Sequence, residues 1–145
     1  MDNLIEPMLK KLLERAILLS KTPLGFEQIQ NDRPGTWLRE YGTVALKSHR
    51  QAGHTTAIMH LRSMFKSSLV VFPYGDRAPA GWDMIPISKT GAFHELEERK
   101  LNGNDFDAVF VDDASSYTDW DMGVIEEFTA KMVRPDHPCF LVLVG

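Results

Sequence analysis

The sequence predicts an α/β domain of three layers, α/β/α, in which helices cover both faces of a mainly parallel β-sheet. Four short apolar runs carry this prediction: Thr43–Leu46, Ser68–Phe72, Phe106–Val111 and Cys139–Val144. Segments with apolar residues at helical spacing separate them, and such alternation is typical of parallel sheets buried on both faces. The 145 residues, 43% hydrophobic and 25% charged, have the length and composition of one globular domain.

The first predicted element is an amphipathic helix over residues 4–16, where apolar residues recur at helical spacing between Lys, Glu and Arg. A helix that packs one face on the core explains this pattern, and so does a helix that binds a partner or a membrane surface. Residues 21–36 contain two prolines and two glycines and are predicted as a loop or irregular connection. Residues 1–36 are therefore the N-terminal helix with its connection, and residues 37–145 are the main domain.

The main domain begins with a short amphipathic piece at residues 37–41, which leads into the strand at Thr43–Leu46. A small polar loop then separates this strand from a helix whose apolar residues begin at Ala57. The next strand, Ser68–Phe72, is closed by Pro73. The predicted order is strand, polar loop, helix and strand.

Residues 74–92 are a long connection rich in Pro and Gly that can hold a short strand at 84–87. Helices are predicted at about 94–100 and about 119–133, on either side of the third apolar run. The chain stops one residue beyond the last predicted strand, at Gly145. It is either a minimal domain or a fragment of a longer protein.

The charge is divided unevenly between the two halves of the chain. Residues 1–72 carry a net charge of +4 and residues 73–145 carry −8, which gives −4 overall. A protein that simply coats nucleic acid would be basic throughout, although the N-terminal half can face phosphates. The single Cys139 excludes an internal disulfide and favours a reducing compartment. With no leader or membrane-spanning run, the sequence predicts a cytoplasmic protein that does not contact membranes.

The strongest chemical signal is the polar segment between the first strand and its helix. The phosphate-binding pattern G-x-x-x-x-G-K-[ST] places glycines against the phosphates, a lysine on the terminal phosphates and a hydroxyl on magnesium. Gly53 matches the second glycine and Thr55 matches the hydroxyl position. Ser48 and His54 stand where the pattern has its first glycine and its lysine.

A second element strengthens the motif. The apolar strand Phe106–Val111 runs directly into Asp112 and Asp113, as in a Walker B motif. The first acid can bind magnesium through water, and the second can act as base for an attacking water. The alternative is that these acids cap a helix or form a turn after a core strand.

These motifs resemble those of the RecA-like P-loop ATPases, specifically viral terminase large subunits and helicase-type ATPases, whose loop often has the form [SA]-x-R-Q-x-G-K-[ST]-T. The matching segments are the run at 48–57, a second strand that ends in Pro73, the acidic strand 109–114, and a last strand that ends at Gly145. The resemblance covers residues 37–145 and agrees in motif order.

The resemblance implies that the chain binds ATP and Mg²⁺ and assigns roles to individual residues. Arg50 and Asp113 would be catalytic, and Thr55 and Asp112 would hold the metal. The nucleotide-binding segment would comprise Lys47, Ser48, Gln51, Ala52, Gly53, His54, Thr55 and Thr56.

Two residues depart from the family pattern. His54 replaces the lysine and is mostly uncharged at neutral pH, and Asp113 is one methylene shorter than the usual Glu. Lambda-like terminases place a functional lysine near the start of the loop, where this chain has Lys47. Alternatively, Lys47 only ends a strand beside solvent.

The expected function is an ATPase domain of a nucleic-acid motor, acting on DNA rather than RNA within a larger assembly of like or unlike subunits. If the terminase resemblance holds, it is a viral protein in the host cytoplasm. The alternative, favoured by His54 and Asp113, is an inactive P-loop-fold module that binds or regulates such a machine. A nucleotide kinase is disfavoured, because no glycine-rich loop or arginine-rich lid is visible.

Other residues carry weaker signals. Trp37, Tyr41 and Trp82 can stack on an adenine base, although core or surface packing is the commoner role of aromatic side chains. His137 and Cys139 flank Pro138 at a strand start and are interpreted as structural, since no His or Cys pair has the spacing of metal ligands.

Overall fold

The computed structural model describes residues 5–31, 33–47, 54–72, 84–86, 106–134 and 137–145. Within them, parallel strands form one sheet in the order β1-β5-β4-β2-β3. The strands are β1 (Thr43–Leu46), β2 (Ser68–Phe72), β3 (Met84–Pro86), β4 (Ala108–Asp112) and β5 (Phe140–Val144). Four of them are the predicted apolar runs, and the short β3 pairs with β2 at the edge. The α/β class and the parallel sheet are confirmed.

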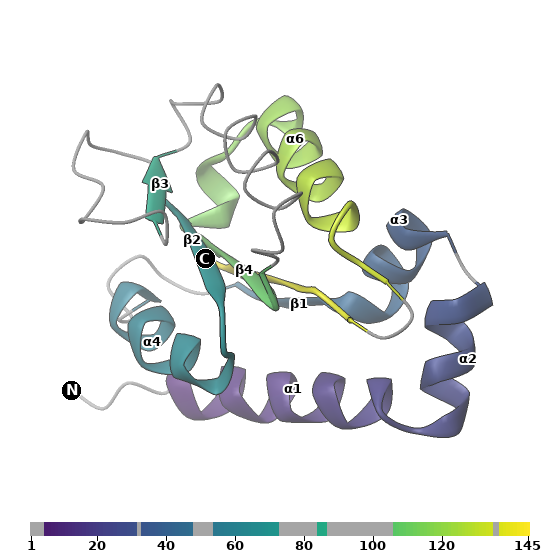
Figure 1. Ribbon diagram of the computed structural model, residues 1–145. Coiled ribbons are helices and arrows are strands. Elements are labelled where there is room, and N and C mark those ends of the chain that lie inside the picture. Colours follow the sequence, from purple (N-terminus) through teal and green to yellow (C-terminus); the bar gives the residue numbers. More distant parts are fainter. Residues whose placement is uncertain (1–4, 32, 48–53, 73–83, 87–105, 135–136) are drawn as a thin grey trace.

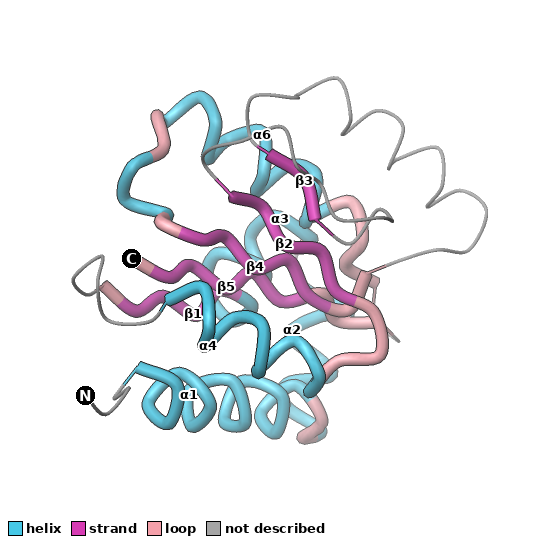
Figure 2. Tube along the Cα trace, turned by 90° about the vertical axis from the view of Figure 1, so that its left-hand side faces the viewer, coloured by secondary structure: helices cyan, strands magenta, loops and turns pink. Residues whose placement is uncertain are grey.

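Helices lie on both faces of the sheet (Figures 1 and 2). On one face, α1 (Ile5–Ser20) packs against β1 and against α4 (His54–Leu61), and α4 also contacts β4. On the other face, α6 (Asp119–Ala130) contacts β5 and α3 (Pro34–Trp37). The connection from β1 through α4 therefore uses one face, and the connection from β4 through α6 uses the other.

The strands are apolar along their length because both of their faces are covered. All five residues of β4 and the first four of β2 are buried. Asp112, the last residue of β4, is the one charged side chain among the buried residues of the described chain, at 9% exposed. Phe110 and Leu141 are fully buried at the centre of the sheet. The acidic side chain of Asp112 therefore lies at the margin of the hydrophobic core.

The prediction that residues 21–36 form a loop is wrong, because α2 (Pro23–Asn31) and α3 occupy most of this segment. Proline is tolerated in the first turn of a helix, where its missing N–H has no partner to lose, and Pro23 and Pro34 each begin a helix. The Thr22 hydroxyl accepts a hydrogen bond from the Gly25 N–H at 3.0 Å and caps α2. The two prolines, which usually break helices, therefore mark the first residues of helices in this segment.

Element boundaries differ from the predictions by a few residues. α1 continues to Ser20 rather than ending at residue 16, and α6 ends at Ala130 rather than 133. Residues 37–41 are helical, as a π-helical turn over Leu38–Gly42 follows α3. The predicted helix at 94–100 and most of the connection 74–92 fall outside the described residues. The division at residue 36 stays a prediction.

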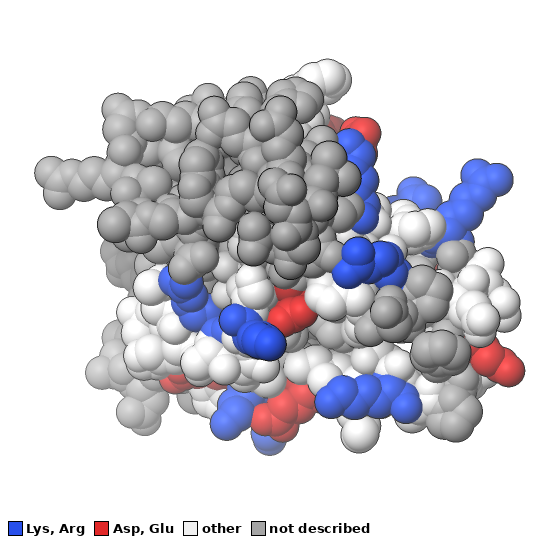
Figure 3. Space-filling view, in the orientation of Figure 1, with Lys and Arg blue, Asp and Glu red and all other residues white. Residues whose placement is uncertain are grey.

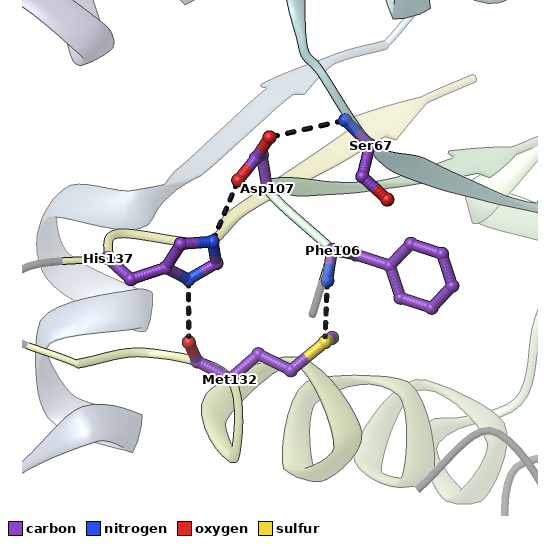
Figure 4. Close-up of polar contacts among 5 residues, drawn as sticks. All are labelled: Ser67, Phe106, Asp107, Met132 and His137. Carbon is purple, nitrogen blue, oxygen red and sulfur yellow. Dashed lines mark hydrogen bonds and ion pairs between the residues drawn. The ribbon is translucent and has the colours of Figure 1, made fainter. Parts of the chain in front are cut away.

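The amino-terminal edge of the sheet is held by a polar cluster (Figure 4). Asp107 accepts from the Ser67 N–H at 3.2 Å and lies 2.7 Å from His137 Nε2. The other nitrogen of His137 lies 3.3 Å from the Met132 carbonyl oxygen. These contacts join the starts of β2, β4 and β5, which agrees with the structural interpretation of His137.

α1 has two apolar faces. Leu9 and Leu13 are fully buried against the core, whereas Met8, Leu18 and Leu19 are more than half exposed. The buried face confirms that the helix packs on the core. No helix in the described part of the chain is long and apolar enough to cross a membrane.

Candidate functional site

The strand that precedes the predicted phosphate loop and the strand that ends in the acidic pair finish at the same edge of the sheet. Val144 of β5 pairs with Leu46 of β1 on one side and with Asp112 of β4 on the other. Neighbouring strands lie about 4.8 Å apart, so the backbones of Leu46 and Asp112 are about 10 Å apart. Side chains, a phosphate group and a metal ion can bridge that distance.

Backbone hydrogen bonds fix this edge beyond the last ladder pairs. The Gly145 N–H donates to the Leu46 carbonyl at 2.9 Å, and the Ser115 N–H donates to the Gly145 carbonyl at 3.0 Å. The end of β1, the end of β5 and the turn that follows the acidic pair are therefore tied together. Their relative placement does not depend on side-chain conformations.

The connections leave this edge in opposite directions. β1 leads to α4 on one face of the sheet, and β4 leads to α6 on the other face (Figure 1). In open α/β sheets, a crevice forms outside the carboxyl ends of strands whose connections diverge in this way, and ligands bind there. The edge near Leu46, Gly145 and Asp112 has this topology.

The acidic pair ends β4 abruptly. Asp112 completes the strand, whereas Asp113 adopts the left-handed conformation, with φ 56° and ψ 46°. Asp is among the few residues that adopt this conformation at modest cost. A short 3-10 turn, Ala114–Ser116, follows and brings the chain back over the sheet edge.

Asp113 occupies the N-cap position of the 3-10 turn Ala114–Ser116. The Asp113 side chain makes no capping hydrogen bond to the 3-10 turn, and α6 is capped by Thr118, whose hydroxyl accepts from the Asp121 N–H at 3.1 Å. The alternative for the pair, a cap or a turn after a core strand, is met at the backbone by the turn at Asp113. The turn alternative describes the backbone correctly and leaves the role of the carboxylates open.

Tyr117 is the residue of this edge that sequence reasoning missed. Its ring packs against the core, and its hydroxyl oxygen is enclosed without a hydrogen-bond partner. Burial raises the pKa of this hydroxyl above its ordinary value, and the charges of Asp112 and Asp113 raise it further. The hydroxyl is therefore neutral and can donate a hydrogen bond. A lone Tyr four residues after an acid has no distinctive spacing, so only the turn reveals it.

Only part of the predicted phosphate loop is described. Lys47 follows β1 and is exposed, and Thr56 is exposed in the first turn of α4. α4 begins at His54, which places His54 and Thr55 in its first turn, although their side chains are not described. The remaining predicted residues lie outside the described part: Ser48, Arg50, Gln51, Ala52 and Gly53.

The donor set fits Mg²⁺ as far as it is described. Mg²⁺ prefers oxygen ligands, keeps several waters and is usually held by one or two carboxylates together with substrate phosphates. Asp112 and Asp113 place two carboxylates at this edge of the sheet. No three His, Cys, Asp or Glu side chains gather in the described residues as a metal site. A Mg²⁺ ion here would rely on phosphate and water for its other ligands.

No family model, characterised protein or solved structure matches this chain.

The predicted adenine platform is not formed by Trp37. This side chain is 1% exposed and packs against the ring of Phe140 at 5.9 Å between centroids. Trp37 and the exposed Tyr41 line a cavity of about 320 Å³ beside the start of β1, at the strand end opposite the predicted phosphate loop. The packing alternative holds for Trp37, and Trp82 is not among the described residues.

A second cavity, of about 470 Å³, lies at the amino-terminal edge beside Asp107 and His137. Lys21 and Lys66 are exposed residues of its lining, which also includes apolar side chains such as Phe65. Parallel α/β sheets place ligand sites at the opposite, carboxyl-terminal edge. This cavity is therefore not part of the candidate site.

Proposed function

We propose that this chain is the ATP-binding domain of a RecA-like P-loop ATPase, similar to the motor domains of terminases and helicases. The observation that carries the proposal is the register of three neighbouring strands, in which Leu46, Val144 and Asp112 stand side by side. The segment that resembles a phosphate loop leaves from one end of this row, and the acidic pair leaves from the other. Diverging connections open the edge between them.

In this proposal each residue keeps the role that the resemblance assigned. The nucleotide phosphates are held by Lys47, Ser48, Gln51, Ala52, Gly53, His54, Thr55 and Thr56. Thr55 and Asp112 hold the metal ion, and Asp113 and Arg50 act on the terminal phosphate. When bound, Mg²⁺ neutralises charge on the phosphate oxygens.

The two acids differ in position, which suits different tasks. Asp112 is buried at the strand end and its backbone is fixed by the β-ladder, so its carboxylate suits a ligand that must not move. Asp113 is less buried and follows the strand in a left-handed turn. Its carboxylate is suited to accept a proton from a water molecule at the crevice.

The proposal is tested by magnesium-dependent ATP hydrolysis with Asp113→Asn. We expect wild-type protein to release phosphate only with Mg²⁺, and the variant to lose at least about 100-fold in rate, as for other general bases. Asp119→Asn, which removes an exposed acid from the first turn of α6, is the matched control and should keep the wild-type rate. Equal rates for Asp113→Asn and wild type would reject the catalytic role.

The second candidate is a P-loop-fold module that binds or regulates a nucleic-acid machine without hydrolysing ATP. The observation in its favour is His54 at the first position of α4, where the family pattern has a lysine. Neutral imidazole leaves the phosphates without that cation. A folded protein that binds ATP without turnover would support this candidate.

Nucleic acid, DNA more than RNA, is proposed as the partner, bound within a larger assembly of like or unlike subunits. Among the described residues on the face shown in Figure 3, Lys and Arg are interspersed with Asp and Glu. Non-specific binding to phosphates requires clustered cations. Because the whole chain carries a net charge of −4, we expect weak DNA binding by the isolated chain.

A further inference from the structure

Tyr117 carries a hydroxyl group that the fold does not use. The ring packs against the hydrophobic core, and the oxygen is enclosed without a hydrogen-bond partner. A buried polar group without a partner destabilises the folded state, whereas Phe would fill the same space without that cost. Such groups in native structures call for an explanation other than stability.

The backbone around this hydroxyl is firmly placed at the candidate site. The Tyr117 N–H donates to the Ala114 carbonyl at 3.3 Å, and the Ser115 N–H donates to Gly145 at 3.0 Å. The turn therefore stands at the carboxyl end of β5, between the end of β1 and the acidic pair. The position of Tyr117 at this edge follows from these backbone hydrogen bonds and does not depend on the predicted phosphate loop.

The charges around the Tyr117 hydroxyl indicate which kind of hydrogen-bond acceptor it can bind. Asp112, Asp113 and Asp121 lie close enough to act on the hydroxyl electrostatically. A neutral phenol among carboxylates is a hydrogen-bond donor at neutral pH. Phosphate oxygens are strong acceptors, and they can approach carboxylates when a metal ion lies between them.

We propose that the Tyr117 hydroxyl donates a hydrogen bond to the terminal phosphate of a nucleoside triphosphate bound at this edge. The inference rests on the proposed function and adds a positioning residue to it. Asp113, the acid assigned to the terminal phosphate, stands at the start of the same turn. Because the hydroxyl oxygen is enclosed before binding, the contact requires the Tyr117 side chain to turn toward the phosphate as the nucleotide enters, while the backbone of the turn stays bonded to Gly145.

The test is Tyr117→Phe, with the exposed Tyr41→Phe as the matched control. Two quantities are measured: the melting temperature without nucleotide, and the dissociation constants of Mg-ATP and Mg-ADP by calorimetry. We expect Tyr117→Phe to raise the melting temperature by about 3 °C, because it removes an unpaired polar group. We expect it to weaken Mg-ATP binding about 10-fold and to leave Mg-ADP binding unchanged. Tyr41→Phe should change none of these values.

The outcomes separate this inference from the proposed function. If wild-type protein does not bind Mg-ATP, the proposed function fails and the role of Tyr117 fails with it. If wild type binds and Tyr117→Phe binds equally well, only the role of Tyr117 is overturned. A lower melting temperature of the variant would show that the hydroxyl supports the fold. An equal loss for Mg-ADP would overturn the assignment to the terminal phosphate.

Discussion

Asp112 and Lys47 are the described residues on which the candidate site depends most. Asp112 was predicted from an apolar strand that runs into two acids, and the structure places it in register with Val144 and, beyond it, Leu46. Lys47 was predicted as a displaced phosphate-binding lysine, and it is exposed directly after β1. Both positions follow from strand ends, which sequence patterns locate well. Tyr117 could not be predicted, because a turn with one left-handed residue determines where its side chain lies.

Replacing Lys47 by Ala tests the displaced-lysine hypothesis. If the ammonium group contacts the phosphates, its loss should weaken Mg-ATP binding about 10-fold or more, since hydrogen bonds between charged groups contribute about 1.5–3 kcal/mol. Calorimetry measures the change. Lys66→Ala, an exposed lysine at the opposite edge of the sheet, is the control and should bind like wild type. Unchanged affinity of Lys47→Ala would favour the alternative that Lys47 only ends the strand.

At the scale of elements, the apolar strands were predictable because both of their faces are buried and their runs are unbroken. The segment 21–36 was not, because its prolines and glycines were interpreted as turn formers. Pro23 begins α2, and Gly25 allows this helix to approach the end of α1. A Cβ atom at Gly25 would stand 1.9 Å from the Leu19 carbonyl oxygen. The glycine is therefore required by a contact between two helices. A local sequence pattern carries no information on such a contact.

Two glycine substitutions test this explanation with opposite signs. Gly25→Ala forces the corner between α1 and α2 apart and should lower the free energy of unfolding by about 2 kcal/mol. Gly123→Ala lies within α6, where a Cβ atom meets nothing within 4 Å, and should raise the free energy of unfolding by about 1 kcal/mol. Urea denaturation measures both values. A Gly25→Ala variant as stable as wild type would show that the corner is not close-packed.

At the scale of the whole molecule, the edge of the sheet at the strand starts differs from the edge at the strand ends. At the amino-terminal edge, the hydrogen bonds of Asp107 and His137 join three strand starts, whereas connections diverge at the carboxyl-terminal edge. Alternation of strands and helices predicts this arrangement, because parallel strands bring their carboxyl ends together. It does not predict the strand order, which is set by which side each crossover takes. The sequence pattern therefore does not predict that β5 lies between β1 and β4.

The most direct test of the central claim is a calorimetric titration of the protein with ATP in the presence and absence of Mg²⁺, repeated with Asp112→Asn. If the end of β1 and the acidic pair form one nucleotide site, wild type should bind one ATP per chain with Mg²⁺, and the variant should lose most of the gain that Mg²⁺ provides. An absence of binding at millimolar Mg-ATP, or affinity that is indifferent to both Mg²⁺ and Asp112, would contradict the claim.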